Sequence, residues 1–269
     1  MKQVSVEQAF VWVQRFAQRE WPLLVPVALA FMALPSLLVD LLAPRNMQMP
    51  LSSLDGSSMQ VAVVPLLLSI VVMLLSFVGQ LTLLALALLP RISVREALGR
   101  AIGRAGVLIA AYLIMFGLVL LAMIVVGVLL RLSPISAVAQ QAFLLGLTFG
   151  IGLFLFVRLA VLGPLIIEKA MGPTAALRHA WALTNRTFWR LLGAIVTYAF
   201  GAGVVVFALS YALGTVVTVA AKMAGQPEVG RVLTGILFNV LMALGGIGLQ
   251  LLLAALYRQL AGSRGSTGI

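Results

Sequence analysis

Arg158 and Glu168 are the residues whose types and spacing first suggest chemistry. The arginine interrupts an apolar run, the glutamate follows ten residues later, and Gly-Pro pairs occur at 163–164 and 172–173. An ionisable side chain at membrane depth is costly, so it is by default a candidate for a functional role with a partner to be identified. Three interpretations follow: a catalytic site, a conduction path or a structural joint.

Other residues that could catalyse a reaction are few. The single histidine, His179, lies in an amphipathic segment, and no His-Glu-x-x-His zinc motif is present. Ser69 and Ser76 have no histidine partner at membrane depth, and Asp40 has no second carboxylate, so neither type of intramembrane protease is indicated. There is no cysteine and no Walker loop. The sequence therefore predicts no enzyme, no metal site and no cofactor.

The composition places the chain in a membrane. Apolar residues make up 62% and charged residues 9% of the 269 positions, and the mean hydropathy is +1.16. The apolar residues gather in continuous runs of about 20 or more, the length a helix needs to cross the hydrocarbon core. These runs lack the alternation of a barrel strand. Six of them stand out, at about 21–43, 61–89, 107–130, 142–163, 191–219 and 232–257.

Three further segments, at about 5–19, 94–105 and 173–185, are amphipathic, with apolar residues on one helical face and arginines on the other. They are too polar to span a bilayer and are expected to lie in its interface. The fold class predicted is all-α: a polytopic membrane protein with about six transmembrane helices and three interfacial helices on the cytoplasmic side. It forms a single integral membrane domain over 1–269.

The amphipathic segments resemble one another. Ser5-Val-Glu-Gln-Ala9-Phe10 parallels Ser93-Val-Arg-Glu-Ala97-Leu98 and Gly172-Pro-Thr-Ala-Ala176-Leu177, and each precedes a pair of spans. One interpretation is three parallel repeats of interfacial helix and hairpin, at 1–90, 91–163 and 164–269. The other is convergent patterning of an amphipathic helix before a span. Both stay open at this point.

The distribution of basic residues predicts the orientation. The net charge is +11, and 13 of the 18 lysines and arginines fall on the side of the amphipathic segments. Positively charged loops stay in the cytoplasm, so both termini are expected there. No soluble surface remains to bind nucleic acid. The expected partners are anionic lipid headgroups, with a membrane-protein partner or a second copy of the chain also open. The headgroup candidates are Arg15, Arg19, Arg95, Arg100, Arg104, Arg178, Arg186 and Arg190. In the other interpretation, which stays open here, these arginines only fix the topology.

A motif of about 36 residues carries a family resemblance. It contains Arg158, Gly163-Pro164, Glu168, Gly172-Pro173, Trp181, Thr184-Asn185 and Phe188-Trp189-Arg190. This pattern resembles the membrane domain fused to some glycerophosphodiester phosphodiesterases and the related stand-alone inner-membrane proteins of the YciC type. The resemblance implies a multi-pass protein of the bacterial cytoplasmic (inner) membrane. It implies no phosphodiesterase activity, because that activity resides in a separate soluble barrel whose metal ligands this chain lacks.

The Gly-Pro pairs predict where Arg158 lies. If 163–164 ends the fourth span, Arg158 is near the inner boundary, and 165–171 forms a short surface turn carrying Glu168. Glu168 is then placed to meet Arg158, or a basic residue of the third amphipathic segment, as a charged latch. The latch candidates are Arg158, Glu168, Gly163, Pro164, Pro173, Trp181, Asn185 and Trp189.

The predicted function is a non-enzymatic membrane scaffold or lipid- and envelope-homeostasis factor, with basic interfacial helices at the cytoplasmic face. The alternative is a small transporter or permease subunit with a cavity near Arg158. The two interpretations differ in whether water reaches Arg158 through the bundle. A packed interior around the arginine argues against transport.

Overall fold

The computed structural model describes residues 5–42, 59–89, 92–133, 136–185 and 187–265. Every regular element in these ranges is a helix, which confirms the all-α prediction. In chain order they are α1 (Val6–Ala28), η1 (Leu29–Ala33), α2 (Leu34–Leu42), α3 (Met59–Leu88), α4 (Val94–Arg131), α5 (Ala137–Leu159), α6 (Leu162–Glu168), α7 (Pro173–Thr184), α8 (Phe188–Met223) and α9 (Pro227–Gly265).

Within the described residues, six helical stretches are long and apolar enough to cross a membrane. They are Val6–Val39, Leu66–Leu88, Val94–Arg131, Val138–Glu168, Phe188–Met223 and Pro227–Gly262. Each contains or overlaps one of the six apolar runs of the sequence. The prediction of a polytopic helical membrane protein is confirmed.

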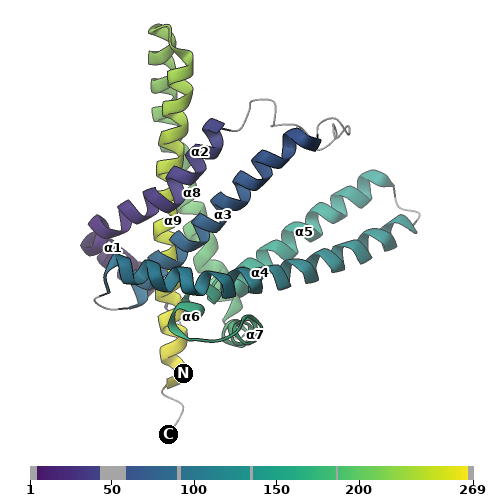
Figure 1. The fold of residues 1–269 in the computed structure, drawn as a ribbon. Helices are drawn as coiled ribbons and strands as arrows, with labels where there is room; N and C mark the ends of the chain where they lie inside the picture. Colours follow the sequence, from purple (N-terminus) through teal and green to yellow (C-terminus); the bar gives the residue numbers. More distant parts are fainter. Residues whose placement is uncertain (1–4, 43–58, 90–91, 134–135, 186, 266–269) are drawn as a thin grey trace.

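Three pairs of long helices diverge from a common end of the molecule (Figure 1). That end, here called the base, holds α6, α7 and the C-terminal part of α9. The core lies at the base, where residues 157–167 and 250–257 are buried throughout. Away from the base, large apolar residues such as Phe116 of α4 and Phe207 of α8 are exposed. In a bilayer these side chains face lipid, which satisfies them as well as a protein interior does.

The structure differs from expectation in how the amphipathic segments end. The first two are continuous with the spans that follow them, and only the third forms a separate helix, α7. α4 has 38 residues, or about 57 Å of helix, almost twice the ~30 Å hydrocarbon core. Residues 94–105 therefore extend beyond the hydrocarbon without a break. No proline interrupts α4, whereas α7 ends at Thr184 and α8 begins at Phe188.

The first span bends instead of breaking. Pro22 and Pro26 lie inside α1, and a single π-helical turn, η1, joins α1 to α2. Each proline removes an amide donor and crowds the preceding turn. A π-turn at such a site keeps the helix going with a shifted hydrogen-bond register. As a result, an amphipathic beginning and an apolar span form one bent element.

The aligned positions of the three amphipathic segments have equivalent structural roles. Ser5, Ser93 and Gly172 are the N-caps of α1, α4 and α7. Four residues after each cap stands a fully buried alanine: Ala9, Ala97 and Ala176. The shared cap fixes where each helix begins, and the small residue lets that first turn approach the core closely. Common descent of the three units stays a prediction.

The segment after Gly163-Pro164 is not a surface turn, so that expectation was wrong. Residues 162–168 form α6, and Leu165, Ile166 and Ile167 are buried. Pro164 is the third residue of α6, within the first turn, where amides have no intrahelical acceptor, so it interrupts no bond. A Cβ on Gly163 would lie 2.8 Å from Leu84 Cδ1, so the glycine lets α6 pack directly on α3.

Candidate functional site

Arg158 lies in the last turn of α5 and is only 8% exposed. The C-terminal end of a helix carries partial negative charge, which favours a cation there. The side chain turns toward the C-terminal end of α7, which carries the same kind of charge. Two helix ends therefore share one guanidinium, and this arrangement brings the ends of α5 and α7 together at the base.

The hydrogen bonds of Arg158 all go to α7 and its C-cap. Nη1 donates to Trp181 O (3.4 Å) and Thr184 Oγ1 (3.3 Å), and Nη2 donates to Asn185 Oδ1 (3.3 Å). The Thr184 hydroxyl lies 3.0 Å from Ala180 O, to which it donates. Nε is buried and has no hydrogen-bond partner among the described residues. The arginine thus supplies donors to carbonyl and amide oxygens that end α7.

Three aromatic rings surround the guanidinium. Its Cζ lies 4.8 Å from the Trp181 ring centroid, 5.2 Å from that of Phe154 and 5.4 Å from that of Phe188. A cation over an aromatic face gains about 1–2 kcal/mol when it is desolvated. The rings also contact each other, with Phe154 edge-on to Trp181 at 5.7 Å. This charge is therefore stabilised by oxygens and rings, and no carboxylate is among its contacts in the described chain.

Glu168 does not pair with Arg158, which corrects the partner expected from the sequence. It ends α6 and accepts a hydrogen bond from the hydroxyl of Tyr257 in α9. Tyr257 is 2% exposed and Glu168 is exposed. The reason is that 162–168 is helical: it carries Glu168 to α9, while Arg158 faces α7. Two separate contacts fix α6 and α7, in place of one charged pair.

Other latch candidates contribute to the same joint. Pro173 is the first residue of α7, and Asn185 is its C-cap. Trp189 is 78% exposed and does not reach Arg158; its ring packs edge-on against Phe188 at 5.4 Å. An exposed tryptophan near the end of a span is typical of the membrane–water interface. The structure therefore brings Trp181 and Asn185 to the arginine directly and Trp189 through Phe188.

The described headgroup candidates lie on α1, α4, α7 and α8. Arg15, Arg19, Arg95, Arg100, Arg178 and Arg190 are exposed and Arg104 is half-buried. Arg186 lies outside the described residues. On α7, Arg178 is exposed while Ala176 and Ala180 on its other face are fully buried. This is the amphipathic pattern that the sequence predicted.

Polar groups inside the bundle hold helices to one another. Gln250 Nε2 of α9 donates to Gln80 Oε1 of α3 (3.2 Å), and Tyr198 Oη of α8 donates to Gly245 O (2.6 Å). Side-chain hydrogen bonds of this kind join transmembrane helices. In the part of the chain that the structure describes, no three His, Cys, Asp or Glu residues gather as metal ligands would.

Sequence reasoning did not find every member of the joint. Phe154 precedes Arg158 by four residues, so it lies on the same helical face, a signal that was available. Thr184 and Phe188 belong to the motif but were not singled out. Tyr257 had no signal at all, since it is 89 residues from Glu168 in sequence.

The fold and the joint define a class: a multi-pass helical membrane protein in which a short amphipathic helix is fixed to the bundle by a buried arginine. Residues 135–266 match the family described as the membrane domain of glycerophosphoryl diester phosphodiesterase. The match covers Arg158, α6, α7 and the motif residues, so the resemblance is confirmed over this range. The family matched is the membrane domain alone, not a catalytic domain. No curated protein and no solved structure matches the chain.

Proposed function

We propose that the protein is a non-enzymatic scaffold of the bacterial inner membrane that holds basic amphipathic helices against the anionic headgroups of the cytoplasmic leaflet. Both termini lie in the cytoplasm in this proposal. The role is in lipid or envelope homeostasis. A helix that carries arginines on one face and a packed apolar face on the other fits such a surface.

One observation carries the proposal: the buried Arg158 fixes α7 to the base while Arg178 of the same helix stays exposed. A free amphipathic helix of 12 residues would be marginal in water. Docked through Arg158 it has a defined orientation, with its basic face outward. The basic beginnings of α1 and α4 gain the same rigidity because they continue into spans.

The alternative of transport receives less support. A conduction path at Arg158 requires space for water or a substrate beside the guanidinium. The arginine is 8% exposed, three aromatic rings cover it, and residues 157–167 around it are buried. Packing of this kind favours a structural role for the charge over a transport role.

The proposal is tested by mass spectrometry of lipids that co-purify with the full chain in mild detergent. We expect phosphatidylglycerol to be enriched over phosphatidylethanolamine relative to the bulk membrane. Replacing Arg95, Arg100 and Arg104 together by glutamine should reduce that enrichment at least about fivefold, because the loss of even one arginine's contribution of about 1 kcal/mol near an anionic surface corresponds to that factor. Lipids in the same proportion as the bulk membrane would contradict the proposal.

A further inference from the structure

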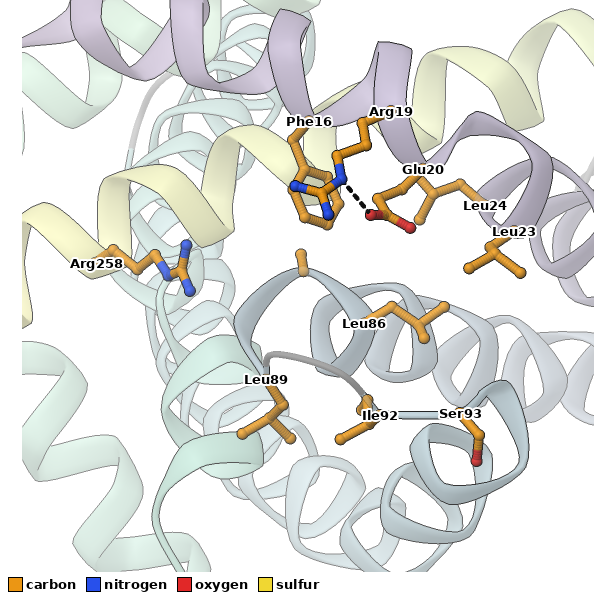
Figure 2. A pocket seen from close by; sticks show the side chains of 11 residues that line it. Phe16, Arg19, Glu20, Leu23, Leu24, Leu86, Leu89, Ile92, Ser93 and Arg258 are labelled. Atoms are coloured by element: carbon orange, nitrogen blue, oxygen red, sulfur yellow. Dashed lines mark ion pairs between the residues drawn. The ribbon is translucent and has the colours of Figure 1, made fainter.

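A cavity of about 690 Å³ opens at the base between α1, the end of α3 and the C-terminal part of α9. We call it the basal cavity. Its walls include Arg19, Glu20 and Leu23 of α1, Leu86 and Leu89 at the end of α3, and Arg258 of α9. Figure 2 shows Arg19 and Glu20 on one side of the cavity, Arg258 at another, and Leu86 and Leu89 across from α1. Three elements far apart in sequence therefore build one site.

Arg258 is held in place by contacts on both sides. Its Nη2 donates to Leu88 O (3.3 Å), the last residue of α3, and its Cζ lies 5.4 Å from the Trp12 ring centroid. These contacts use one of the five donors that a guanidinium offers. The side chain is therefore oriented in advance, and within the described part of the chain its other N–H groups remain for an anion. A preorganised arginine loses less entropy when it binds.

Arg19 supplies a second cation with a different setting. Its Nε lies 3.3 Å from Glu20 Oε1, and 85% of its side chain is exposed. An exposed pair of this kind is weak, so a phosphate can draw Arg19 toward the cavity at small cost. The terminal nitrogens of Arg19 make no hydrogen bond within the described part of the chain. The two arginines outnumber the single carboxylate, so the charged part of the wall is net positive.

Most of the rest of the described wall is apolar, with Ser93 as its one further polar residue. Leu23, Leu86 and Leu89 face the cavity between the two arginines. Leu23 is 46% exposed, so this surface continues to the outside of the bundle. A free phosphate would use only the guanidinium groups and leave the leucines uncovered. A ligand that carries both a phosphate and hydrocarbon covers the whole wall.

We propose that the basal cavity is a discrete site for one anionic phospholipid, with the phosphate bound by Arg258 and Arg19 and the acyl chains lying over the leucines. This inference deepens the proposed function and rests on it, because it names one defined site within a surface that otherwise attracts headgroups by charge alone. A zwitterionic headgroup gains less here, because its own amine offsets the phosphate charge and is repelled by the two arginines, which outnumber Glu20.

The test is native mass spectrometry of the full chain titrated with phosphatidylglycerol. We expect one lipid to bind more tightly than the rest, and Arg19→Gln and Arg258→Gln each to weaken that first binding step roughly fivefold or more, since each removes charge-assisted hydrogen bonds to phosphate. Leu23→Trp, which fills the cavity without changing charge, should weaken it as well. Leu23→Trp also keeps the proposal testable if Arg258→Gln misfolds because it has lost the hydrogen bond to Leu88 O.

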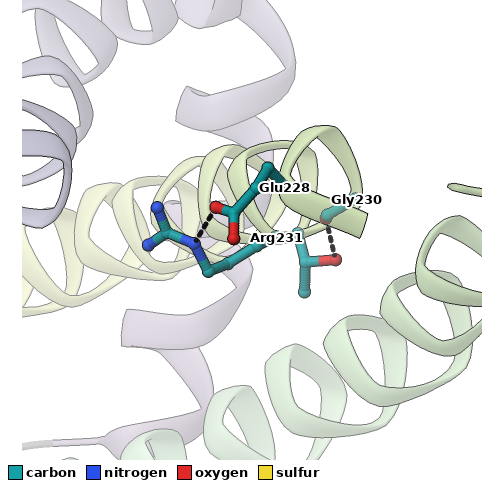
Figure 3. A network of polar contacts seen from close by, with 4 residues as sticks. Glu228, Gly230 and Arg231 are labelled. Carbon is teal, nitrogen blue, oxygen red and sulfur yellow. Dashed lines mark hydrogen bonds and ion pairs between the residues drawn. The ribbon is translucent and has the colours of Figure 1, made fainter. Parts of the chain in front are cut away.

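Arg231→Gln is the matched control. Arg231 also belongs to an exposed arginine–glutamate pair, with Nε 3.2 Å from Glu228 Oε2, and it lies at the start of α9, far from the base (Figures 1 and 3). Arg231→Gln removes one positive charge, as Arg19→Gln does, but it does so far from the basal cavity. We therefore expect no change in the first lipid-binding step.

Three results would overturn the site. One is an equal effect of Arg231→Gln and Arg19→Gln, which would mean diffuse attraction and would leave the proposed function intact. The second is equal binding of phosphatidylethanolamine. The third is displacement of the lipid by millimolar inorganic phosphate, which would identify a free-anion site. No preference for anionic lipid in any variant would remove both proposals.

Discussion

At the residue scale, Arg158 shows how a charge can be buried without a carboxylate. A lone cation in low dielectric costs several kcal/mol unless hydrogen bonds and charge compensate it. Here the compensation comes from a carbonyl, a hydroxyl, an amide oxygen and three rings, most of them at the end of one helix. Such a site therefore requires the planar guanidinium group of arginine and its several donors, and not only a positive charge.

Arg158→Lys and Arg158→Met should both destabilise the protein. Methionine removes the donor to Asn185 Oδ1 and one of the donors to Trp181 O, which Thr184 Oγ1 also reaches (3.2 Å), at a cost of roughly 1–3 kcal/mol. Lysine keeps the charge, but its single ammonium group cannot donate to several oxygens at once as the planar guanidinium group does. We therefore expect most of that loss to persist. Thermal unfolding in detergent, followed by the loss of the monodisperse peak on size-exclusion chromatography, measures both. A lysine variant as stable as wild type would contradict the geometric account.

The separate roles of Arg158 and Glu168 provide the control for this experiment. Because Glu168 bonds to Tyr257 and not to Arg158, Arg158→Met and Glu168→Gln should have additive effects on unfolding. Glu168→Gln removes the charge of the acceptor and Tyr257→Phe removes the donor of the same contact, so their combined effect should be smaller than the sum. Coupling between Arg158 and Glu168 would restore the ion pair expected from the sequence.

Sequence reasoning identified this region but not its pairings. The positions of Arg158, Glu168 and the Gly-Pro pairs were visible in the printed chain. Choosing a partner for Arg158 by charge led to Glu168, since opposite charges ten residues apart are the simplest pairing. The actual acceptors are one main-chain carbonyl, Trp181 O, and the uncharged side-chain oxygens of Thr184 and Asn185, none of which a search by opposite charge selects.

At the element scale, glycines divide into those that meet a neighbour and those that do not. In α9, a Cβ on Gly246 would lie 2.6 Å from Met32 Cε, and one on Gly248 would overlap the Tyr198 hydroxyl. Tyr198 in turn donates to Gly245 O, so α8 and α9 cross closely at this point. Gly146 of α5, by contrast, has nothing within 4 Å of its Cβ position.

Gly248→Ala and Gly146→Ala should therefore differ although the chemical change is the same. The added methyl group at Gly248 pushes Tyr198 from its hydrogen bond, and we expect a loss of roughly 1–3 kcal/mol in unfolding free energy from overpacking. At Gly146 the added methyl group meets open space and improves helix propensity, so stability should hold or rise slightly. Equal losses for the two variants, measured by the same thermal assay, would show that the crossing is looser than described.

The elements themselves were more predictable than their breaks. Runs of 20 or more apolar residues can satisfy their backbone in lipid only as helices, so the six spans followed from composition. Whether an amphipathic beginning is separate from its span depends on whether a local breaker ends the helix: Pro22 and Pro26 do not end α1, which continues through η1. α4 has none and α7 is bounded by Pro173 and Asn185, a difference that hydropathy alone does not weigh.

At the scale of the whole molecule, the described parts of the chain form one buried base and three splayed pairs of helices (Figure 1). Ser5 N, at the beginning of the described chain, donates to Gln259 Oε1 near the end of α9 (3.0 Å), so both ends of the described chain lie at the base. The turn between α8 and α9 lies at the opposite extreme. An even number of spans requires both ends of the described chain to lie on the same side of the membrane. It does not say whether that side faces the cytoplasm.

The positive-inside rule supplies that choice, and cysteine labelling tests it. The chain has no cysteine, so Thr174→Cys on α7 and Gln226→Cys in the α8–α9 turn each introduce one exposed thiol without altering a charge. Because the arginines gather at the base, we expect a membrane-impermeant maleimide to label Gln226→Cys in cells with a permeable outer membrane and Thr174→Cys only after the inner membrane is opened. The reverse pattern would invert the molecule and move the basic helices to the outer face. There, the anionic cytoplasmic leaflet that the proposed function requires is absent, so labelling of Thr174→Cys in closed cells would end the proposal.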